Sequence, residues 1–379
     1  MNGMQQKLKI GYVTSSLSSH GGWDRYSKGI IESAAKQVDT VVLTRKDASN
    51  ENDTLKIHKV LPTKDNSFNL KTQLNVFLNS LKYFRGCDGI HSMMEPFAPG
   101  AALASVFLGI PFFLTIAGTY SVPPRGYSPK DFVKRQLMKL MYKRASLVAT
   151  GSLKNIELIE QVVKLKFWKF IPFGVDPKTF YQMENVKKED PPFIFTVGGV
   201  KPRKGADVTI QALALLKNEF PNLHYKVVGE TKSAEGFVNY LIELIKKHNL
   251  ENKVHFVGRV TDDQLRELYN RCAIMVLAAQ TRDGAFEGFP MVYYEAQASG
   301  APVITTRGFG SEYVVKDGYN GFLVDEDNIQ GIAEAIRKIL GNHKLHQEMI
   351  KNSVSEAAKN TWDHTAKFYL DVYNQVINK

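Results

Sequence analysis

The stretch Phe193-Ile-Phe-Thr-Val197, followed by Gly198-Gly-Val-Lys-Pro-Arg-Lys-Gly205, decides the fold of this 379-residue chain. The apolar and β-branched run predicts a buried strand, and the glycines after it predict a tight turn into a helix. A strand that passes through such a turn into a helix is the first half of a βαβ unit, whose next strand is parallel. The loop also carries Lys201, Arg203 and Lys204, either as solvated side chains or facing a ligand at the carboxyl end of the strand.

Strand-like runs of this kind recur along the whole chain, separated by helical patterns of about 10–20 residues. Parallel strands need crossover helices, which cover both faces of a sheet. Two sets of six strands therefore predict an α/β protein with two Rossmann-like domains that face a central crevice. The predicted strands are 9–14, 40–44, 89–92, 112–116, 147–150 and 170–172, then 193–197, 224–228, 254–257, 274–278, 303–305 and 322–324.

The domain boundaries follow from length and composition. At about 150 residues per domain, the chain is long enough for two. Prolines and charges between Gly174 and Pro191 are typical of a linker, so we expect domains at 1–180 and 181–360. A last helix in 361–379 is expected to return to the first domain, with an apolar stripe of Phe368, Val372 and Val376.

The positive charge is confined to the first half. The chain has 49 Lys and Arg against 38 Asp and Glu, a net charge of +11. Residues 1–180 carry 25 basic and 13 acidic side chains, and residues 121–170 alone carry eleven and three. Such a face attracts nucleic acid, anionic lipid or a phosphorylated substrate. Nucleic acid is the poorest of the three, because no recognition motif or interleaved aromatic residues accompany the charge.

The helical segment 130–144 carries much of this charge and an apolar stripe. We expect the stripe to pack on the core, although it also fits the surface of a bilayer, and we expect the lysines to attract anionic lipid. The stripe consists of Phe132, Val133, Leu137, Leu140 and Met141.

Localisation is predicted from cysteine content and apolar segments. Cys87 and Cys272 have no metal or redox spacing, which favours a reducing cytosol, and the polar start of the chain predicts no secretion signal. No charged residue lies between Glu95 and Arg125, but glycine and proline interrupt the segment. It therefore predicts a buried helix at 101–108 and a strand rather than a membrane span. We expect a cytoplasmic protein, either free or peripheral at the inner face of the membrane.

The most specific signal is Phe286-Glu-Gly-Phe-Pro-Met-Val-Tyr-Tyr-Glu295. Glu287 lies in a turn, and Glu295 is expected about two turns into a helix that begins near Pro290. Amides at 288–292 would then form an anion-binding helix start between the two carboxylates. The first carboxylate suits a sugar hydroxyl and the second a ribose diol; the alternative is two solvated glutamates.

Two places in the first half have weaker signals. Gly21-Gly22 follows the first strand and precedes a helix expected near Tyr26, either as a plain turn or as a site where backbone approaches a ligand. It lacks the six-residue dinucleotide fingerprint, which argues against a nicotinamide cofactor. His91 and the segment Thr115–Thr119 end strands on the expected acceptor side, although a lone histidine is more often a hydrogen-bonded core residue.

Over nearly its whole length the chain resembles the retaining, nucleotide-sugar-dependent glycosyltransferases of family 4, the glycosyl transferases group 1 type with GT-B architecture. The two-glutamate spacing is highly specific, and the other motifs are individually moderate. The carriers are Gly21-Gly22, Asp88–His91, Ile171–Asp176 with Phe180, Gly198–Gly205, Val228–Glu230, Phe256–Arg259, Glu287–Glu295 with the following Ala-Ser-Gly-Ala-Pro-Val, and Gly318–Leu323.

The resemblance implies a role for each matching residue. Glu287, Lys204 and Arg203 would be catalytic, with Glu287 at the donor sugar and the two cations on the diphosphate, while Glu295 would hold the ribose. The acceptor side would include His91, Gly118 and Thr119. The donor would contact Gly21, Gly22, Gly198, Gly199, Arg203, Lys204, Glu230, Arg259, Glu287, Gly288, Phe289, Pro290, Met291, Val292 and Glu295.

The resemblance also implies the chemistry, a hexosyltransferase reaction with a UDP-sugar or GDP-sugar donor and no metal or other cofactor. The acceptor would be a glycan or a lipid-linked glycan of surface polysaccharide synthesis. Three positions depart from the family pattern: Gly199 replaces an arginine, Ala117 a histidine and Phe173 an asparagine. Because Gly199 and Ala117 replace common site residues, a nucleotide-sugar-binding protein with weak or no activity is one alternative. A sugar-nucleotide epimerase of the same fold is another.

Overall fold

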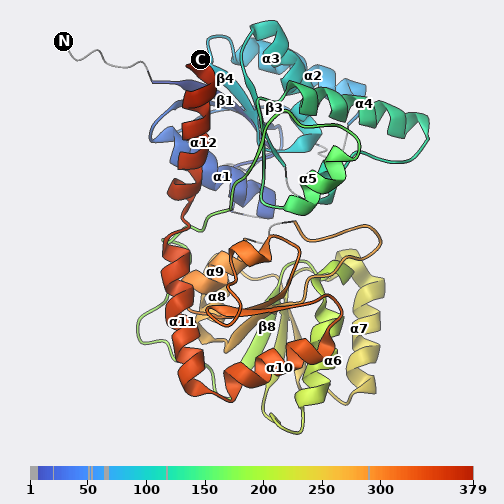
Figure 1. The fold of residues 1–379 in the computed structure, drawn as a ribbon, viewed down its shortest axis with the longest axis vertical. Coiled ribbons are helices and arrows are strands. Elements are labelled where there is room, and N and C mark those ends of the chain that lie inside the picture. Colours follow the sequence, from blue (N-terminus) through green and yellow to red (C-terminus); the bar gives the residue numbers. More distant parts are fainter. Residues whose placement is uncertain are drawn as a thin grey trace, which may run out of the picture. The chain divides into compact units, whose positions relative to one another are not determined.

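The computed structural model describes residues 7–19, 21–49, 52, 54–63, 68–116, 118–288 and 291–378. Its contacts divide the chain into unit 1, Met1–Gly174 with Trp362–Lys379, and unit 2, Val175–Thr361 (Figure 1). The first boundary lies six residues before the expected one. Val175 already belongs to unit 2, because it bridges to Thr361 and its amide donates to the carbonyl of Asn360 at 2.9 Å.

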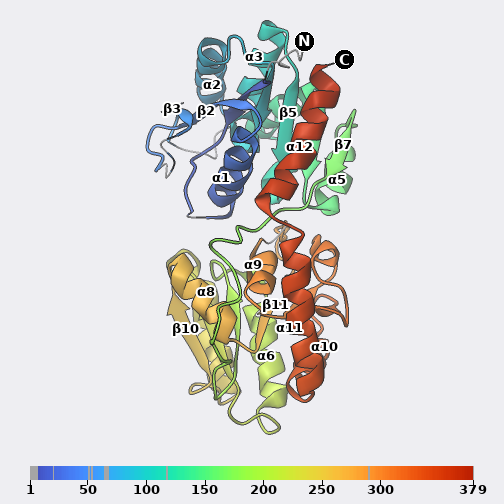
Figure 2. The ribbon, with the colours of Figure 1, turned by 90° about the vertical axis from the view of Figure 1, so that its left-hand side faces the viewer.

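Unit 1 contains a fully parallel seven-stranded sheet with the order β3-β2-β1-β4-β5-β6-β7. Helices α2, α3 and α4 pack in sequence against one another, and α12 lies along α1 (Figure 2). The strands are β1 (Lys9–Val13), β2 (Asp39–Arg45), β3 (Lys56–Leu61), β4 (Gly89–Ser92), β5 (Phe112–Ile116), β6 (Leu147–Thr150) and β7 (Trp168–Phe170). The helices are α1 (Gly22–Ala35), α2 (Leu70–Tyr83), α3 (Ala98–Leu108), α4 (Pro129–Arg144), α5 (Leu153–Glu160) and α12 (Trp362–Ile377), with short 3₁₀ turns η1 (Glu95–Phe97) and η2 (Thr119–Ser121).

Unit 2 contains a fully parallel six-stranded sheet with the order β10-β9-β8-β11-β12-β13. Helix α6 packs between α7 and α10, and α9 packs between α8 and α11. The strands are β8 (Phe193–Val197), β9 (His224–Val228), β10 (Val254–Gly258), β11 (Ile274–Leu277), β12 (Val303–Thr306) and β13 (Gly321–Val324). The helices are α6 (Ala206–Leu216), α7 (Glu235–Lys247), α8 (Asp262–Arg271), α9 (Val292–Ala298), α10 (Ile329–Leu340) and α11 (His343–Ala358), with 3₁₀ turns η3 (Pro202–Lys204), η4 (Lys232–Ala234) and η5 (Ser311–Tyr313).

These sheets confirm the predicted fold class of two Rossmann-like α/β domains. Strand β3 was not predicted, because its sequence Lys-Ile-His-Lys-Val-Leu alternates with polar residues at the edge of the sheet. The apolar segment forms α3 and β5, as expected. Helix α3 begins three residues earlier than predicted, since proline is tolerated in the first turn, where Pro99 lies. Among the described residues, every helix is too short or too polar to span a lipid bilayer.

Helix α12 differs from its predicted pattern. Its buried face includes Trp362, Tyr369 and Tyr373, whereas Phe368 and Val376 are only partly buried. The two tyrosines can lie on the buried face because their hydroxyls have hydrogen-bonding partners inside unit 1. Tyr373 approaches Tyr12 at 3.4 Å, and Tyr369 approaches Thr115 at 3.0 Å.

Candidate functional site

The candidate site of unit 2 lies where the order of its sheet reverses. Strand β8 pairs with β9 on one side and β11 on the other, so the chain leaves these two neighbouring strands, β8 and β11, in opposite directions. In open α/β sheets, ligands bind beyond the carboxyl ends of strands at such a point. The loops that follow β8 and β11 carry Gly198–Gly205 and Glu287.

The loops after β8 and β9 are in close backbone contact. The amide of Val200 donates to the carbonyl of Glu230 at 2.9 Å, and that of Gly198 to Val228 at 2.9 Å. A Cβ atom on Gly229 would lie 1.9 Å from the carbonyl oxygen of Gly198. Only glycine permits this approach, which fixes the path of the basic loop.

The basic loop is also anchored to the end of β11. Gly205 has a φ of +66°, and a Cβ atom there would lie 1.7 Å from the carbonyl oxygen of Ala278. Two residues earlier, the carbonyl of Arg203 accepts a hydrogen bond from the amide of Gln280 at 2.9 Å. The turn η3 is thereby held against the strand that leads to Glu287.

This arrangement brings the predicted catalytic residues together. The Nζ atom of Lys204 lies 2.8 Å from Oε2 of Glu287, and Arg203 donates to the same oxygen. The side chains of Glu287 and Lys204 are 11% and 12% exposed, so the three groups form a largely buried ionic cluster. Residues 203 and 287 are 84 positions apart in the sequence.

The cluster fixes the charge state of Glu287. Burial alone would raise the pKa of its carboxyl, but Lys204 and Arg203 together outweigh burial and hold that pKa below its ordinary value. Burial lowers the pKa of the Lys204 ammonium, and Glu287 opposes that shift. Lys201 also acts on Lys204, so the loop carries three cations where two of them contact one carboxylate, and the surplus positive charge favours an anion.

The second predicted glutamate lies nearer the start of its helix than expected. Helix α9 begins at Val292 rather than near Pro290, so Glu295 is in its first turn. Glu295 is 3% exposed, and Tyr269 of α8 donates to its Oε2 at 3.4 Å. The tyrosine thus helps to hold the carboxylate in place between α8 and α9.

The remaining predicted donor-side residues of unit 2 follow the same sheet edge. Glu230 lies two residues after β9, Arg259 comes directly after β10, and Gly288 follows Glu287. Met291 is buried and Val292 partly buried at the start of α9. Phe289 and Pro290 lie outside the described residues.

The predicted residues of unit 1 follow β1 and β5. Gly21 has a φ of +88°, and α1 already begins at Gly22 rather than near Tyr26. Gly118 lies two residues after the end of β5, and Thr119 opens the turn η2. Ala117 and the side chain of Thr119 lie outside the described part of the structure.

The structure corrects the acceptor-side prediction for His91. This residue is fully buried, its Nδ1 contacts the hydroxyl of Tyr373 at 2.5 Å, and its Nε2 contacts Thr115 at 2.9 Å. Burial lowers the pKa of the imidazole to about 3. Both nitrogens are engaged inside unit 1, so His91 is a core residue that ties α12 to the sheet.

Sequence reasoning missed a second polar cluster beside Gly21. The carboxylate of Asp24 accepts hydrogen bonds from Ser15, from Ser16 at 2.6 Å and from Ser18 at 3.4 Å. Asp24 lies in the first turn of α1, so the cluster orders the loop between β1 and that helix. The only sequence signal was the run of serines before the glycines.

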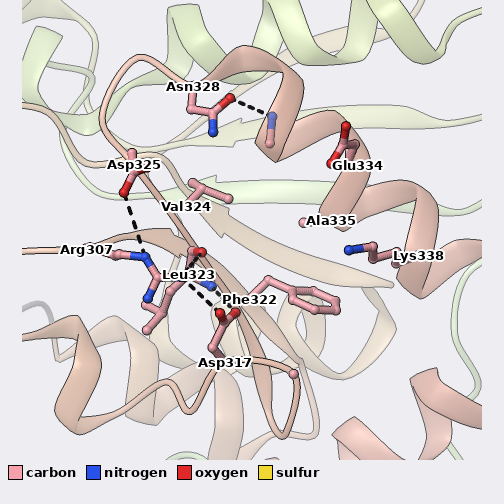
Figure 3. Close-up of a pocket in the computed structure, with 12 residues that line it drawn as sticks. Arg307, Asp317, Phe322, Leu323, Val324, Asp325, Asn328, Glu334, Ala335 and Lys338 are labelled. Carbon is pink, nitrogen blue, oxygen red and sulfur yellow. Dashed lines mark hydrogen bonds and ion pairs between the residues drawn. The ribbon is translucent and has the colours of Figure 1, made fainter.

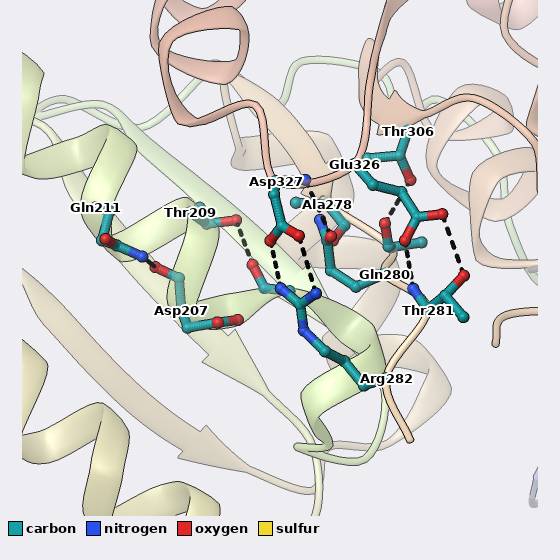
Figure 4. Close-up of polar contacts among 12 residues, drawn as sticks. Asp207, Thr209, Gln211, Ala278, Gln280, Thr281, Arg282, Thr306, Glu326 and Asp327 are labelled. Carbon is teal, nitrogen blue, oxygen red and sulfur yellow. Dashed lines mark hydrogen bonds and ion pairs between the residues drawn. The ribbon is translucent and has the colours of Figure 1, made fainter. Parts of the chain in front are cut away.

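Sequence reasoning also missed the polar contacts that join the end of β11 to the loop before α10 (Figure 4). Gln280, Thr281 and Arg282 contact Glu326 and Asp327, 45 to 47 residues further along the chain. No motif connects the two segments, and only the parallel order β11-β12-β13 brings them to one edge.

A cavity in unit 2 lies outside this arrangement. A cavity of about 380 Å³ lies between β13 and α10, and its mixed lining includes Arg307, Asp325 and Lys338 (Figure 3). Arg307 is already engaged there, with Asp317 at 2.9 Å and the carbonyl of Leu323 at 3.0 Å. Within the described ranges, no three His, Cys, Asp or Glu side chains are grouped as metal ligands.

Comparison with known families identifies the class of unit 2. Residues 177–355 match the family described as "Glycosyl transferases group 1". Unit 2 is therefore a glycosyl transferases group 1 domain, as the basic loop and the two glutamates predict.

Individual proteins extend the comparison beyond that domain. D-inositol 3-phosphate glycosyltransferase of Nocardioides sp. is 30% identical over 198 residues, which cover 49% of this chain and 42% of that protein. The chain spans less than half the length of the first curated relatives that it matches. An uncharacterized glycosyltransferase of Haemophilus influenzae is 24% identical over 91% of this chain and 94% of its own length.

Solved structures show the fold of both units. Anabaena HepE, crystallised in complex with UDP, matches 97% of this chain and 100% of its own, with a TM-score of 0.76 and 19% identity. The architecture is that of GT-B glycosyltransferases, which confirms the predicted fold class.

Proposed function

We propose that the protein is a retaining glycosyltransferase that moves a hexosyl group from a nucleotide-diphosphate sugar to an acceptor hydroxyl. The observation that carries the proposal is the buried cluster of Glu287 with Arg203 and Lys204 at the point where the order of the unit 2 sheet reverses. It combines a place for a diphosphate with a carboxylate for the donor sugar. The glycosyl transferases group 1 domain at 177–355 and relatives named as glycosyltransferases support the same activity.

The cations would act on the leaving group. In the proposed reaction the acceptor oxygen attacks the anomeric carbon, and the bond from that carbon to the phosphate oxygen breaks. The departing phosphate takes the proton of the acceptor hydroxyl, and the nucleoside diphosphate leaves. Arg203 and Lys204 would stabilise the charge that develops on it, so the reaction would need no metal ion.

The donor is proposed to be a UDP-sugar in preference to a GDP-sugar. Anabaena HepE, whose fold is similar, was crystallised with UDP and with UDP-glucose. Glu295, held by Tyr269, would bind the ribose, and Glu287 would face the sugar. We propose a glycan or lipid-linked glycan of surface polysaccharide synthesis as the acceptor.

Incubation of the pure protein with UDP-, GDP-, ADP- and dTDP-sugars tests the proposal. A transferase slowly releases free nucleoside diphosphate from one donor even without its acceptor. Interconversion of sugars without release would instead identify an epimerase. Binding without either reaction would identify a nucleotide-sugar-binding protein, an alternative that Gly199 and Ala117 keep open.

We further propose that unit 1 associates with an anionic membrane surface at the inner face of the cytoplasmic membrane. The apolar stripe of α4 is divided: Met141 is buried and Leu137 partly buried, whereas Phe132, Val133 and Leu140 are 54%, 36% and 37% exposed. Lysines flank the exposed residues on this basic helix. Exposed apolar side chains between cations are typical of helices that lie in a lipid interface.

Helix α2 exposes further apolar side chains of unit 1. It exposes Leu70, Leu74 and Leu78 at four-residue spacing, and both α2 and α4 pack on α3. Sedimentation with liposomes tests the proposal: binding should need anionic lipid and weaken with salt. Equal sedimentation with neutral and anionic liposomes would contradict it.

A further inference from the structure

The segment that leads from β11 to Glu287 is fastened at its start by five side chains, which we call the clasp: Gln280, Thr281, Arg282, Glu326 and Asp327. Two hydrogen bonds join the guanidinium of Arg282 to the carboxylate of Asp327, one of them 3.0 Å long (Figure 4). The amide and hydroxyl of Thr281 donate to Glu326 at 2.5 and 3.1 Å. The side-chain oxygen of Gln280 accepts from the amide of Asp327 at 3.0 Å.

The clasp reaches both halves of the ionic cluster. Its first residue, Gln280, donates its amide to the carbonyl of Arg203 at 2.9 Å. Its third, Arg282, exchanges two backbone hydrogen bonds with Ala285, at 2.9 and 2.8 Å, and the turn they close ends two residues before Glu287. Residues 280–282 therefore fix both the backbone of Arg203 and the backbone that leads to Glu287.

The pair at the centre of the clasp is poorly placed to serve stability alone. The side chains of Arg282 and Asp327 are 30% and 61% exposed, and exposed ion pairs contribute little to folding. The planar guanidinium nevertheless makes a two-pronged contact, which fixes orientation as well as distance. Asp327 also has a φ of +56°, a conformation that asparagine and aspartate tolerate better than other side chains.

We propose that Arg282 and Asp327 are positioning residues that hold Glu287 opposite Arg203 and Lys204 during sugar transfer. The inference rests on the proposed glycosyltransferase function. Small displacements of a reacting group reduce the rate of the chemical step much more than they reduce binding. Loss of the pair should therefore lower kcat and leave the donor KM nearly unchanged.

The test uses the full chain with Arg282→Gln, Asp327→Asn and the double variant; asparagine keeps the tolerance for positive φ. The matched control is Arg337→Gln, which breaks another exposed pair of unit 2, Arg337 with Glu219 at 2.8 and 3.1 Å. We expect kcat to fall about tenfold in each single variant and no further in the double variant. The midpoint of thermal unfolding should change by less than about 3 °C in all four proteins.

Arg282→Lys keeps the charge but not the two-pronged geometry, and it should recover only part of the lost kcat. Wild-type kcat in both single variants, or an equal loss in the Arg337→Gln control, would overturn the proposal.

Hydrogen exchange separates the two proposals. The backbone amides of Asp283–Gly288 should exchange faster in Arg282→Gln than in wild type, and those in Arg337→Gln should not. Unchanged exchange there would contradict the clasp whatever the activity. Suppose that exchange is faster in Arg282→Gln but that the wild-type protein releases nucleoside diphosphate from no donor. The clasp would then still position Glu287, and the proposed transferase function would be wrong.

Discussion

Lys204 lies on a buried carboxylate with Arg203 beside it and Lys201 acting on it from the same loop. Sequence alone identified these cations, because they follow a strand and a glycine turn. It could not pair them with Glu287, which is brought close only by the parallel contact of β8 with β11. This arrangement leads to a test of Lys204.

Lys204→Met should weaken UDP binding by about 10- to 100-fold, the range expected for one or two lost hydrogen bonds to a charged group. Titration calorimetry at fixed ionic strength measures the change. Lys217→Met removes a cation at the far end of α6, where its Nζ donates to the carbonyl of His248 at 3.0 Å, and should leave the affinity unchanged. Equal affinities for all three proteins would show that Lys204 does not bind the diphosphate.

His91 should make unit 1 sensitive to mild acid. In the unfolded chain the imidazole has a pKa of about 6.5, so it binds a proton below that pH. In the folded protein the buried imidazole has a pKa of about 3 and stays neutral over the same range. Stability is therefore lost as pH falls, by about 1–2 kcal/mol from this residue between pH 6.5 and 5. His91→Gln should remove that part of the pH dependence.

Tryptophan fluorescence during urea unfolding measures this effect selectively, since all three tryptophans, Trp23, Trp168 and Trp362, belong to unit 1. The same slope of stability against pH in wild type and His91→Gln would contradict the assignment of a neutral, buried imidazole.

Among the elements, the turn η3 depends most on a single residue. Gly205→Ala would place a methyl group 1.7 Å from the carbonyl oxygen of Ala278 in a left-handed conformation, which forces the basic loop away from β11. We expect a loss of about 2–4 kcal/mol in the unfolding free energy and weaker UDP binding.

Gly318→Ala is the control for the backbone conformation, because its φ is +74° with no atom within 4 Å of the added carbon. It should cost only about 1–2 kcal/mol. If denaturation gives equal losses for the two variants, close packing does not hold the loop.

How far the sequence predicts an element depends on how it is buried. Strand β8 matches its predicted bounds because it is a mostly apolar run that is buried at every residue. Strand β9 also matches its predicted bounds, although His224 and Lys226 within it are only partly buried. Strand β3 was not predicted because it lies at the edge of the sheet and its side chains, apart from Leu61, are only partly buried or exposed. The apolar stripe of α4 is partly in the core and partly exposed. The buried face of α12 depends on hydroxyl contacts of its tyrosines, which the spacing of apolar residues does not indicate.

At the scale of the whole molecule, the two units differ in chain continuity. Unit 2 is one uninterrupted segment, whereas unit 1 needs α12 from the far end of the chain. Trp362, Tyr369 and Tyr373 of α12 are buried in unit 1, and the two tyrosines are hydrogen-bonded there to β1, β4 and β5.

A fragment of residues 175–361 should therefore fold and bind UDP by itself, while a fragment of residues 1–174 should not fold cooperatively. Circular dichroism with thermal unfolding, followed by UDP titration of the shorter fragment, checks both expectations. Cooperative unfolding of 1–174 would show that α12 is dispensable for the core of unit 1.

The central claim is that the carboxylate of Glu287, set between Arg203 and Lys204, takes part in sugar transfer. The most direct measurement is the rate of nucleoside diphosphate release from the preferred nucleotide-sugar by wild type and Glu287→Ala, with circular dichroism to verify the fold. We predict that the variant is folded and that its turnover is abolished. Near-wild-type turnover in a folded Glu287→Ala protein would contradict the account.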